Sequence, residues 1–104
     1  MRDLNFEVDG QALRKVGDFS GIVRGTKGYL RCRFEFKDSD WNNLTCLAVF
    51  ESTGKESAVL IQKDRTCQVP DEITDDAYFK IRVVGAHGKT KQIITNKELI
   101  TQGG

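Results

Sequence analysis

The stretch from residue 30 to residue 50, LRCRFEFKDSDWNNLTCLAVF, constrains the fold most strongly, because two strand-like runs flank one short polar corner. In the first run, apolar and charged residues alternate. The apolar members are Leu30, Cys32, Phe34 and Phe36, and the charged members are Arg31, Arg33, Glu35 and Lys37. A side-chain period of two is typical of a β-strand that has one face in a core and the other in water.

The polar corner, residues 38–44, carries Trp41, the one tryptophan of the chain. Its aspartate, serine and asparagine side chains bond readily to nearby backbone groups, which favours a turn or a single helical turn capped by Asp38 or Ser39. Such a turn projects Trp41 back toward the apolar faces of the flanking strands. We therefore expect Trp41 to be buried and to close one end of the core.

The second run, residues 45–51, is apolar at both odd and even positions. This pattern predicts a central strand that is covered on both of its faces. We assign the whole stretch of residues 30–51 to structure, because no part of it has the residues of a catalytic site.

Short apolar runs separated by turn signals fill the rest of the chain. Strands are expected at residues 4–8, 12–16, 58–63, 67–69, 79–84, 91–95 and 98–101, with hairpin tips at residues 9–10 and 85–88. Residues 17–28 should be irregular, and Pro70 should end a strand before one helical turn or a wide loop. Roughly seven to nine short strands predict one all-β domain over residues 1–104, a two-sheet antiparallel β-sandwich. Its expected core residues are Phe34, Phe36, Trp41, Phe50, Phe79, Ile81 and Val83.

The charge balance gives no global attraction to nucleic acid or to an anionic membrane, because 16 basic residues face 15 acidic ones and the net charge is +1. No apolar run approaches the roughly 18 to 20 residues of a membrane span, and the N-terminus lacks the apolar stretch of a signal peptide. We therefore expect a soluble chain that is made inside a cell and has no membrane partner.

The three cysteines, Cys32, Cys46 and Cys67, lie in strand-like runs and have no CxxC spacing. We expect reduced, buried thiols, with one disulfide or a reactive thiol as the alternative. Because the chain has one histidine, we do not expect a zinc site built from cysteine and histidine.

No motif points to an enzyme or to a cofactor, and we expect neither. His87 lies in a predicted turn beside a glycine and is expected to be an exposed loop residue. The acidic loop at residues 71–76 lacks the spacing of an EF-hand, so we expect solvated carboxylates rather than a calcium site. Residues 17–28 contain neither glycine pattern of a phosphate-binding loop.

A basic strand face offers a candidate contact surface. Arg31, Arg33 and Lys37 share one face, and Lys80 and Arg82 are expected on a neighbouring strand. The aromatic residues alternate to the opposite face, which favours a solvated or partner-facing surface over one that binds nucleic acid. The terminal strands, at residues 4–8 and 98–101, are expected at sheet edges, with Ile100 as a partner-facing position.

The ordered pattern from Phe34 onward resembles a small module of tail, baseplate and fibre proteins from phages and prophages of Gram-positive bacteria. The resemblance covers about two thirds of the chain and leaves out the first 28 residues. The matching elements are Asp40 with Trp41, the strand end from Ala48 to Phe50, Val69 with Pro70, Gly85, and Ile94 with Thr95.

This resemblance implies an immunoglobulin-like β-sandwich in a non-enzymatic virion protein of the tail, baseplate or capsid surface, assembled in the host cytoplasm. Its partners would be other virion proteins and, in a homo-oligomer, further copies of itself, bound through a strand edge or sheet face. We expect either a stand-alone small protein or a module of a longer one. One alternative is a module that binds host cell-wall polysaccharide through exposed aromatics, with Trp41 and Tyr78 as candidates. The other, a nucleic-acid-binding domain, would use the basic face.

Overall fold

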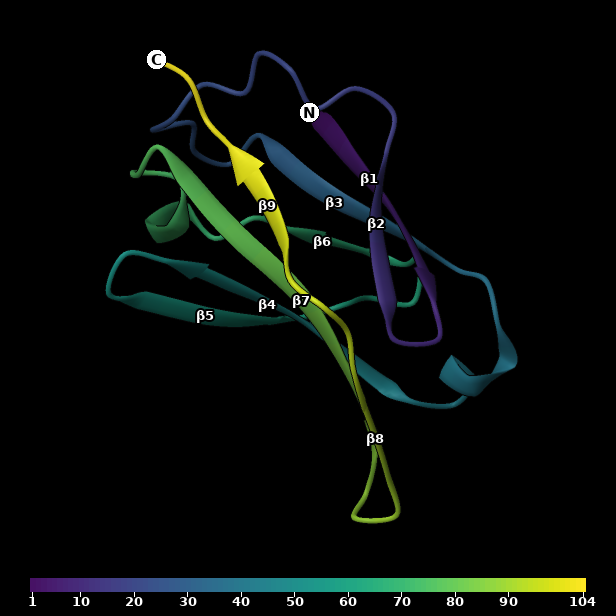
Figure 1. The fold of residues 1–104 in the computed structure, drawn as a ribbon. Coiled ribbons are helices and arrows are strands. Elements are labelled where there is room, and N and C mark those ends of the chain that lie inside the picture. Colours follow the sequence, from purple (N-terminus) through teal and green to yellow (C-terminus); the bar gives the residue numbers. More distant parts are fainter.

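The computed structural model describes residues 1–104 as two packed β-sheets (Figure 1). The strands are β1 (Arg2–Asp9), β2 (Ala12–Val16), β3 (Leu30–Phe36), β4 (Thr45–Ser52), β5 (Lys55–Leu60), β6 (Thr66–Gln68), β7 (Tyr78–His87), β8 (Lys91–Ile94) and β9 (Glu98–Thr101). Two single turns of 3-10 helix, η1 (Ser39–Trp41) and η2 (Asp71–Ile73), connect them. The prediction of an all-β, two-sheet sandwich is confirmed.

The first sheet has the strand order β2-β1-β3-β6, and the second has the order β5-β4-β7-β8, with β9 paired to the first half of β7. Neighbouring strands are antiparallel with one exception, because β1 and β3 run parallel. A parallel pair needs a long crossover, and the irregular residues 17–29 supply it. The β3-β6 and β5-β4-β7-β8 orders match strands B-E and C′-C-F-G of an immunoglobulin domain.

The core lies between the two sheets. Six of the seven residues expected there are buried, namely Phe34, Trp41, Phe50, Phe79, Ile81 and Val83. Phe36 is half-buried, because it ends β3 at the margin of the sandwich, and its ring centroid lies 5.3 Å from that of Trp41.

Trp41 is 1 % exposed and joins three separate segments. Its indole N–H donates to the Gly10 carbonyl at the β1–β2 turn, at 2.8 Å, and its ring lies directly against Gly85 of β7. The prediction of a buried corner tryptophan is confirmed. Asp38 precedes η1 but its side chain does not cap it; instead Asp38 Oδ2 accepts a 2.6 Å bond from the Gly10 amide.

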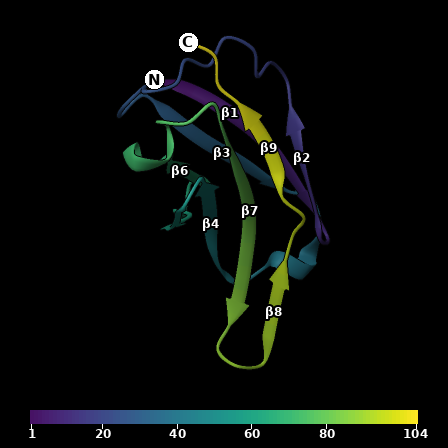
Figure 2. The ribbon, with the colours of Figure 1, turned by 60° about the vertical axis from the view of Figure 1, so that its left-hand side comes forward.

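Two elements are displaced by three residues from their predicted positions. The hairpin tip expected at residues 85–88 lies at residues 88–90, because β7 continues to His87 and Gly85 is an interior strand residue. The strand expected at residues 58–63 begins and ends three residues earlier, as β5. The β7–β8 hairpin extends beyond the rest of the sandwich in both views (Figures 1 and 2).

Candidate assembly surface

The outer face of the second sheet carries a row of aliphatic side chains that crosses four strands. Leu47 of β4 pairs in register with Leu60 of β5 on one side and with Val84 of β7 on the other, and Val84 pairs with Ile94 of β8. Leu60 is 56 % exposed and Ile94 is 44 % exposed. We call Leu60, Leu47, Val84 and Ile94 the aliphatic row.

The strand β4 is central, as predicted, and one of its faces packs into the core. The prediction that its other face is covered holds for Val49, which is 6 % exposed, but Leu47 on the same face is only half-buried. No helix or strand lies over this outer face of the sheet (Figures 1 and 2). An apolar pattern on both faces is typical of a strand covered on both sides. In this sheet Val49 is buried within the chain, whereas Leu60 and Ile94 on the same face remain in contact with water.

The outer edge of β5 borders the aliphatic row and has no pairing strand. The Ile61 amide donates to the Cys46 carbonyl at 2.9 Å, so alternate residues of β5 pair with β4. Glu56, Ala58 and Leu60 therefore direct their backbone amides and carbonyls away from the sheet. β4 is the sole strand that pairs with β5.

The β2 edge, in contrast, is covered within the molecule. The side chain of Asn96 accepts a bond from the Leu13 amide at 2.8 Å and donates to the Leu13 carbonyl at 3.2 Å, as a neighbouring strand would. Lys15 Nζ reaches across to the Leu99 carbonyl of β9 at 2.9 Å. These contacts join the two sheets along one side of the sandwich.

The β6 edge is short and partly occupied. The Thr66 carbonyl accepts a 3.0 Å bond from the Gln62 amide, and the Thr66 amide donates to Asp64 Oδ1 at 3.2 Å. The β6 edge therefore has fewer free backbone groups than the β5 edge.

Of the two terminal strands expected at sheet edges, β9 is an edge strand, because it pairs with β7 alone. β1 is not an edge strand, because it lies between β2 and β3. Ile100 is not partner-facing, because its side chain is 1 % exposed in the core. The Gln102 amide donates to the Ala77 carbonyl at 2.7 Å, and the alternation of an antiparallel ladder then directs the Ile100 amide toward Phe79 of β7. Chain ends lie near the surface, but β9 is short and its apolar residue fills the core.

The basic residues Arg31, Arg33 and Lys37 share the outer face of the first sheet, as predicted, but acidic neighbours pair with each of them. Asp3 lies 2.7 Å from Arg31 and 3.5 Å from Arg33. Lys37 lies 2.9 Å from Glu35 and 3.4 Å from Glu7. The bond from Arg31 lowers the pKa of Asp3, so this carboxylate stays charged and offsets the positive face.

Lys80 and Arg82 do not extend the basic face. They lie on β7 and point outward from the second sheet, on the opposite side of the sandwich. Arg82 pairs with Glu51 of β4 at 3.6 Å. The prediction that the two groups of basic residues share one surface is wrong, because β7 and β3 belong to different sheets.

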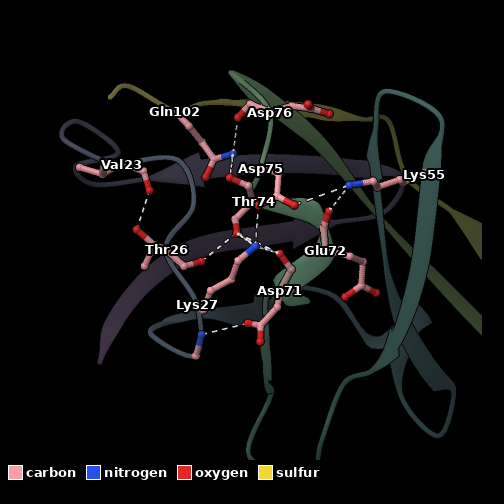
Figure 3. A network of polar contacts seen from close by, with 11 residues as sticks. Val23, Thr26, Lys27, Lys55, Asp71, Glu72, Thr74, Asp75, Asp76 and Gln102 are labelled. Carbon is pink, nitrogen blue, oxygen red and sulfur yellow. Dashed lines mark hydrogen bonds and ion pairs between the residues drawn. The ribbon is translucent and has the colours of Figure 1, made fainter.

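The acidic loop is part of a polar network around Lys27 (Figure 3). The Lys27 ammonium donates to the Asp71 carbonyl at 2.5 Å and to Asp75 Oδ1 at 2.7 Å, and the hydrogen bond from Lys27 lowers the pKa of Asp75. Asp71 Oδ1 accepts the Gly28 amide at 3.0 Å. These contacts tie the irregular residues 17–29 to η2, so the loop has a structural role.

His87 is exposed, as predicted, although it ends a strand rather than occupying a turn. It borders a surface hollow of about 550 Å³ together with Asn42, Asn43 and Lys91.

No helix of the structure combines the length and the apolar character that crossing a membrane would demand.

All three cysteines are buried and carry free thiols. Cys32 and Cys67 pair in register across β3 and β6, and the contact with Cys67, together with burial, raises the pKa of Cys32 well above its usual value. A protonated, buried thiol reacts slowly.

We expect the melting temperature to be the same with and without a reductant, because no disulfide supports the fold. Circular dichroism melting curves in the presence and absence of dithiothreitol test this. A lower melting temperature in reductant would instead indicate a bond between Cys32 and Cys67.

The aliphatic row and the β5 edge were not among the sequence-predicted contact sites. The sequence did contain a sign of the aliphatic row. Val83-Val84 and Ile93-Ile94 are adjacent apolar pairs, and in each pair the second residue, Val84 or Ile94, faces outward from the sheet. Tyr29, which is 50 % exposed, was also missed as an accessible aromatic.

Comparisons of this chain with protein-family models, with curated proteins and with solved structures found no match.

Proposed function

We propose that this chain is a structural protein of a phage particle, placed at the tail, baseplate or capsid surface, and that it works by protein-protein contact rather than by catalysis. The aliphatic row carries the assembly part of this proposal. The resemblance of the chain from Phe34 onward to modules of phage structural proteins supports the kind of particle.

The row is a reasonable contact surface on energetic grounds. Leu60 and Ile94 each keep about half of their surface in water. Full burial of such a side chain contributes about 1.5 to 3 kcal/mol, so covering the exposed half of each contributes about 1 kcal/mol. Contiguous exposed apolar side chains rimmed by charge are typical of protein contact sites.

The two alternatives have less support. Trp41 is buried, so it does not offer its ring to a sugar, and Tyr78 is the one aromatic of the carbohydrate-binding hypothesis that stays accessible. The ion pairs of Arg31, Arg33 and Lys37 with Asp3, Glu7 and Glu35 offset the charge that a nucleic-acid surface requires.

The test is incorporation into particles made by the host that encodes the chain. We expect the tagged wild type to band with particles in a density gradient, and Ile94→Lys to be incorporated at least about tenfold less, because it places a charge in the aliphatic row. Val16→Lys is the matched control, since Val16 is an exposed aliphatic residue on the other sheet.

Three outcomes would count against the proposal. They are a wild type absent from particles, an Ile94→Lys protein incorporated as well as wild type, and a loss of incorporation that Val16→Lys shares. Binding of the wild type to host wall polysaccharide in place of particles would favour the carbohydrate-binding alternative.

A further inference from the structure

The free backbone groups of β5 are arranged symmetrically about Ala58. We infer that β5 pairs antiparallel with β5 of a second copy, around a twofold axis at Ala58, so that two five-stranded sheets become one continuous sheet. This inference rests on the proposed assembly function and names one partner for it, a second copy of this chain.

The register about Ala58 uses every free group of the edge. Ala58 faces Ala58 of the second copy, and Glu56 faces the second copy's Leu60. In this register the facing residues exchange backbone hydrogen bonds. The backbone amides and carbonyls of Glu56, Ala58 and Leu60 are free to do so, because they point away from β4. The small side chain of Ala58 lets the two strands approach at the axis.

Neighbouring registers are less favourable. An axis at Val59 sets Lys55 opposite Lys63 of the second copy, which lies in the turn after β5 and cannot continue the ladder. An axis at Ser57 sets Leu60 opposite Gly54, which lies in the β4–β5 turn and cannot continue the ladder. The Ala58 register sets no like charges opposite each other.

Few of the features that keep strand edges apart are present along β5. Exposed edges are usually blunted by lysine, proline, a bulge or a covering loop. A lysine, Lys55, begins the strand, but residues 57–60 are Ser-Ala-Val-Leu, without charge or proline, and Leu60 is exposed. β5 lies at the margin of the molecule with β4 on one side and no element on the other (Figure 1).

Substitutions at Ala58, the residue on the proposed axis, test the dimer by sedimentation velocity of the purified chain. We expect the wild type to form a dimer, and Ala58→Asp or Ala58→Lys alone to raise the dimer dissociation constant by about tenfold or more, because two like charges meet at the axis. An equimolar mixture of the two variants should recover the dimer, since opposite charges then meet. Ala58 is exposed in the single chain, so both variants should keep the circular dichroism spectrum of the folded wild type.

Gln92→Lys is the matched control, because Gln92 is an exposed residue on β8 at the opposite edge of the same sheet, and it should leave the dimer unchanged. A monomeric wild type, or a mixture that fails to recover the dimer, would overturn the inference. A monomeric wild type that still enters particles would leave the proposed function standing. A wild-type dimer that the mixture recovers but that never enters particles would support the β5 pairing and contradict the proposed function.

Discussion

Replacing Trp41 by alanine is expected to lower the free energy of unfolding by about 3 to 5 kcal/mol. The indole is buried, packs against the Phe36 ring at a tilt of 42° and donates to the Gly10 carbonyl, so the truncation leaves a cavity and an unpaired carbonyl at once. Urea unfolding followed by circular dichroism measures the change. In the wild type, tryptophan fluorescence should be blue-shifted and poorly quenched by iodide.

Two further variants separate the causes of this loss. Trp41→Phe keeps much of the packing but loses the bond to Gly10, so it should cost less than the alanine variant. Tyr78→Ala removes an exposed aromatic and should change stability by about 1 kcal/mol or less. A Trp41→Ala variant as stable as Tyr78→Ala would contradict the role given to the corner.

Features set by local patterns could be predicted from the sequence. The alternation in residues 30–36 predicted β3 correctly. The short polar side chains around Trp41 predicted a turn or a single helical turn, and the structure has the helical turn, without a side-chain cap, and a buried Trp41. Both depend on a residue and its near neighbours, which is the range over which a side-chain period operates.

The strand partners could not be predicted in the same way. Nothing local in residues 4–8 indicates that β1 lies between β2 and β3, or that it runs parallel to β3. The nearness of Ile100 to the chain end placed it correctly on an edge strand, but the pairing of β9 with β7 directs its side chain into the core rather than toward a partner. Such placements depend on long-range pairing.

The candidate site shows a different limit. The apolar pattern at residues 45–51 predicted a strand covered on both faces, but a pattern cannot distinguish a cover supplied by the same chain from one supplied by a partner. In the folded chain Val49 on the outer face is buried, Leu47 is half-buried and the neighbouring Leu60 is 56 % exposed. The assembly proposal accounts for the apolar side chains of this face that stay exposed in the isolated chain.

Replacing Gly85 by alanine is expected to cost about 1 to 3 kcal/mol by overpacking. A Cβ at this position would lie 2.5 Å from Cζ3 and 2.8 Å from Cε3 of Trp41. The backbone is not the obstacle, because Gly85 is not among the residues with positive φ. This makes the glycine a packing requirement of the indole ring.

The cost should therefore disappear in a Trp41→Ala background, where the new Cβ enters the cavity. A double-mutant cycle in urea should give a coupling of about 1 to 3 kcal/mol, well above the roughly 0.5 kcal/mol seen between independent sites. Gly54→Ala is the control, since Gly54 has a φ of +69° with open space around it, so its strain should be the same with or without Trp41. Additive effects of Gly85→Ala and Trp41→Ala would show that Trp41 does not require a glycine at residue 85.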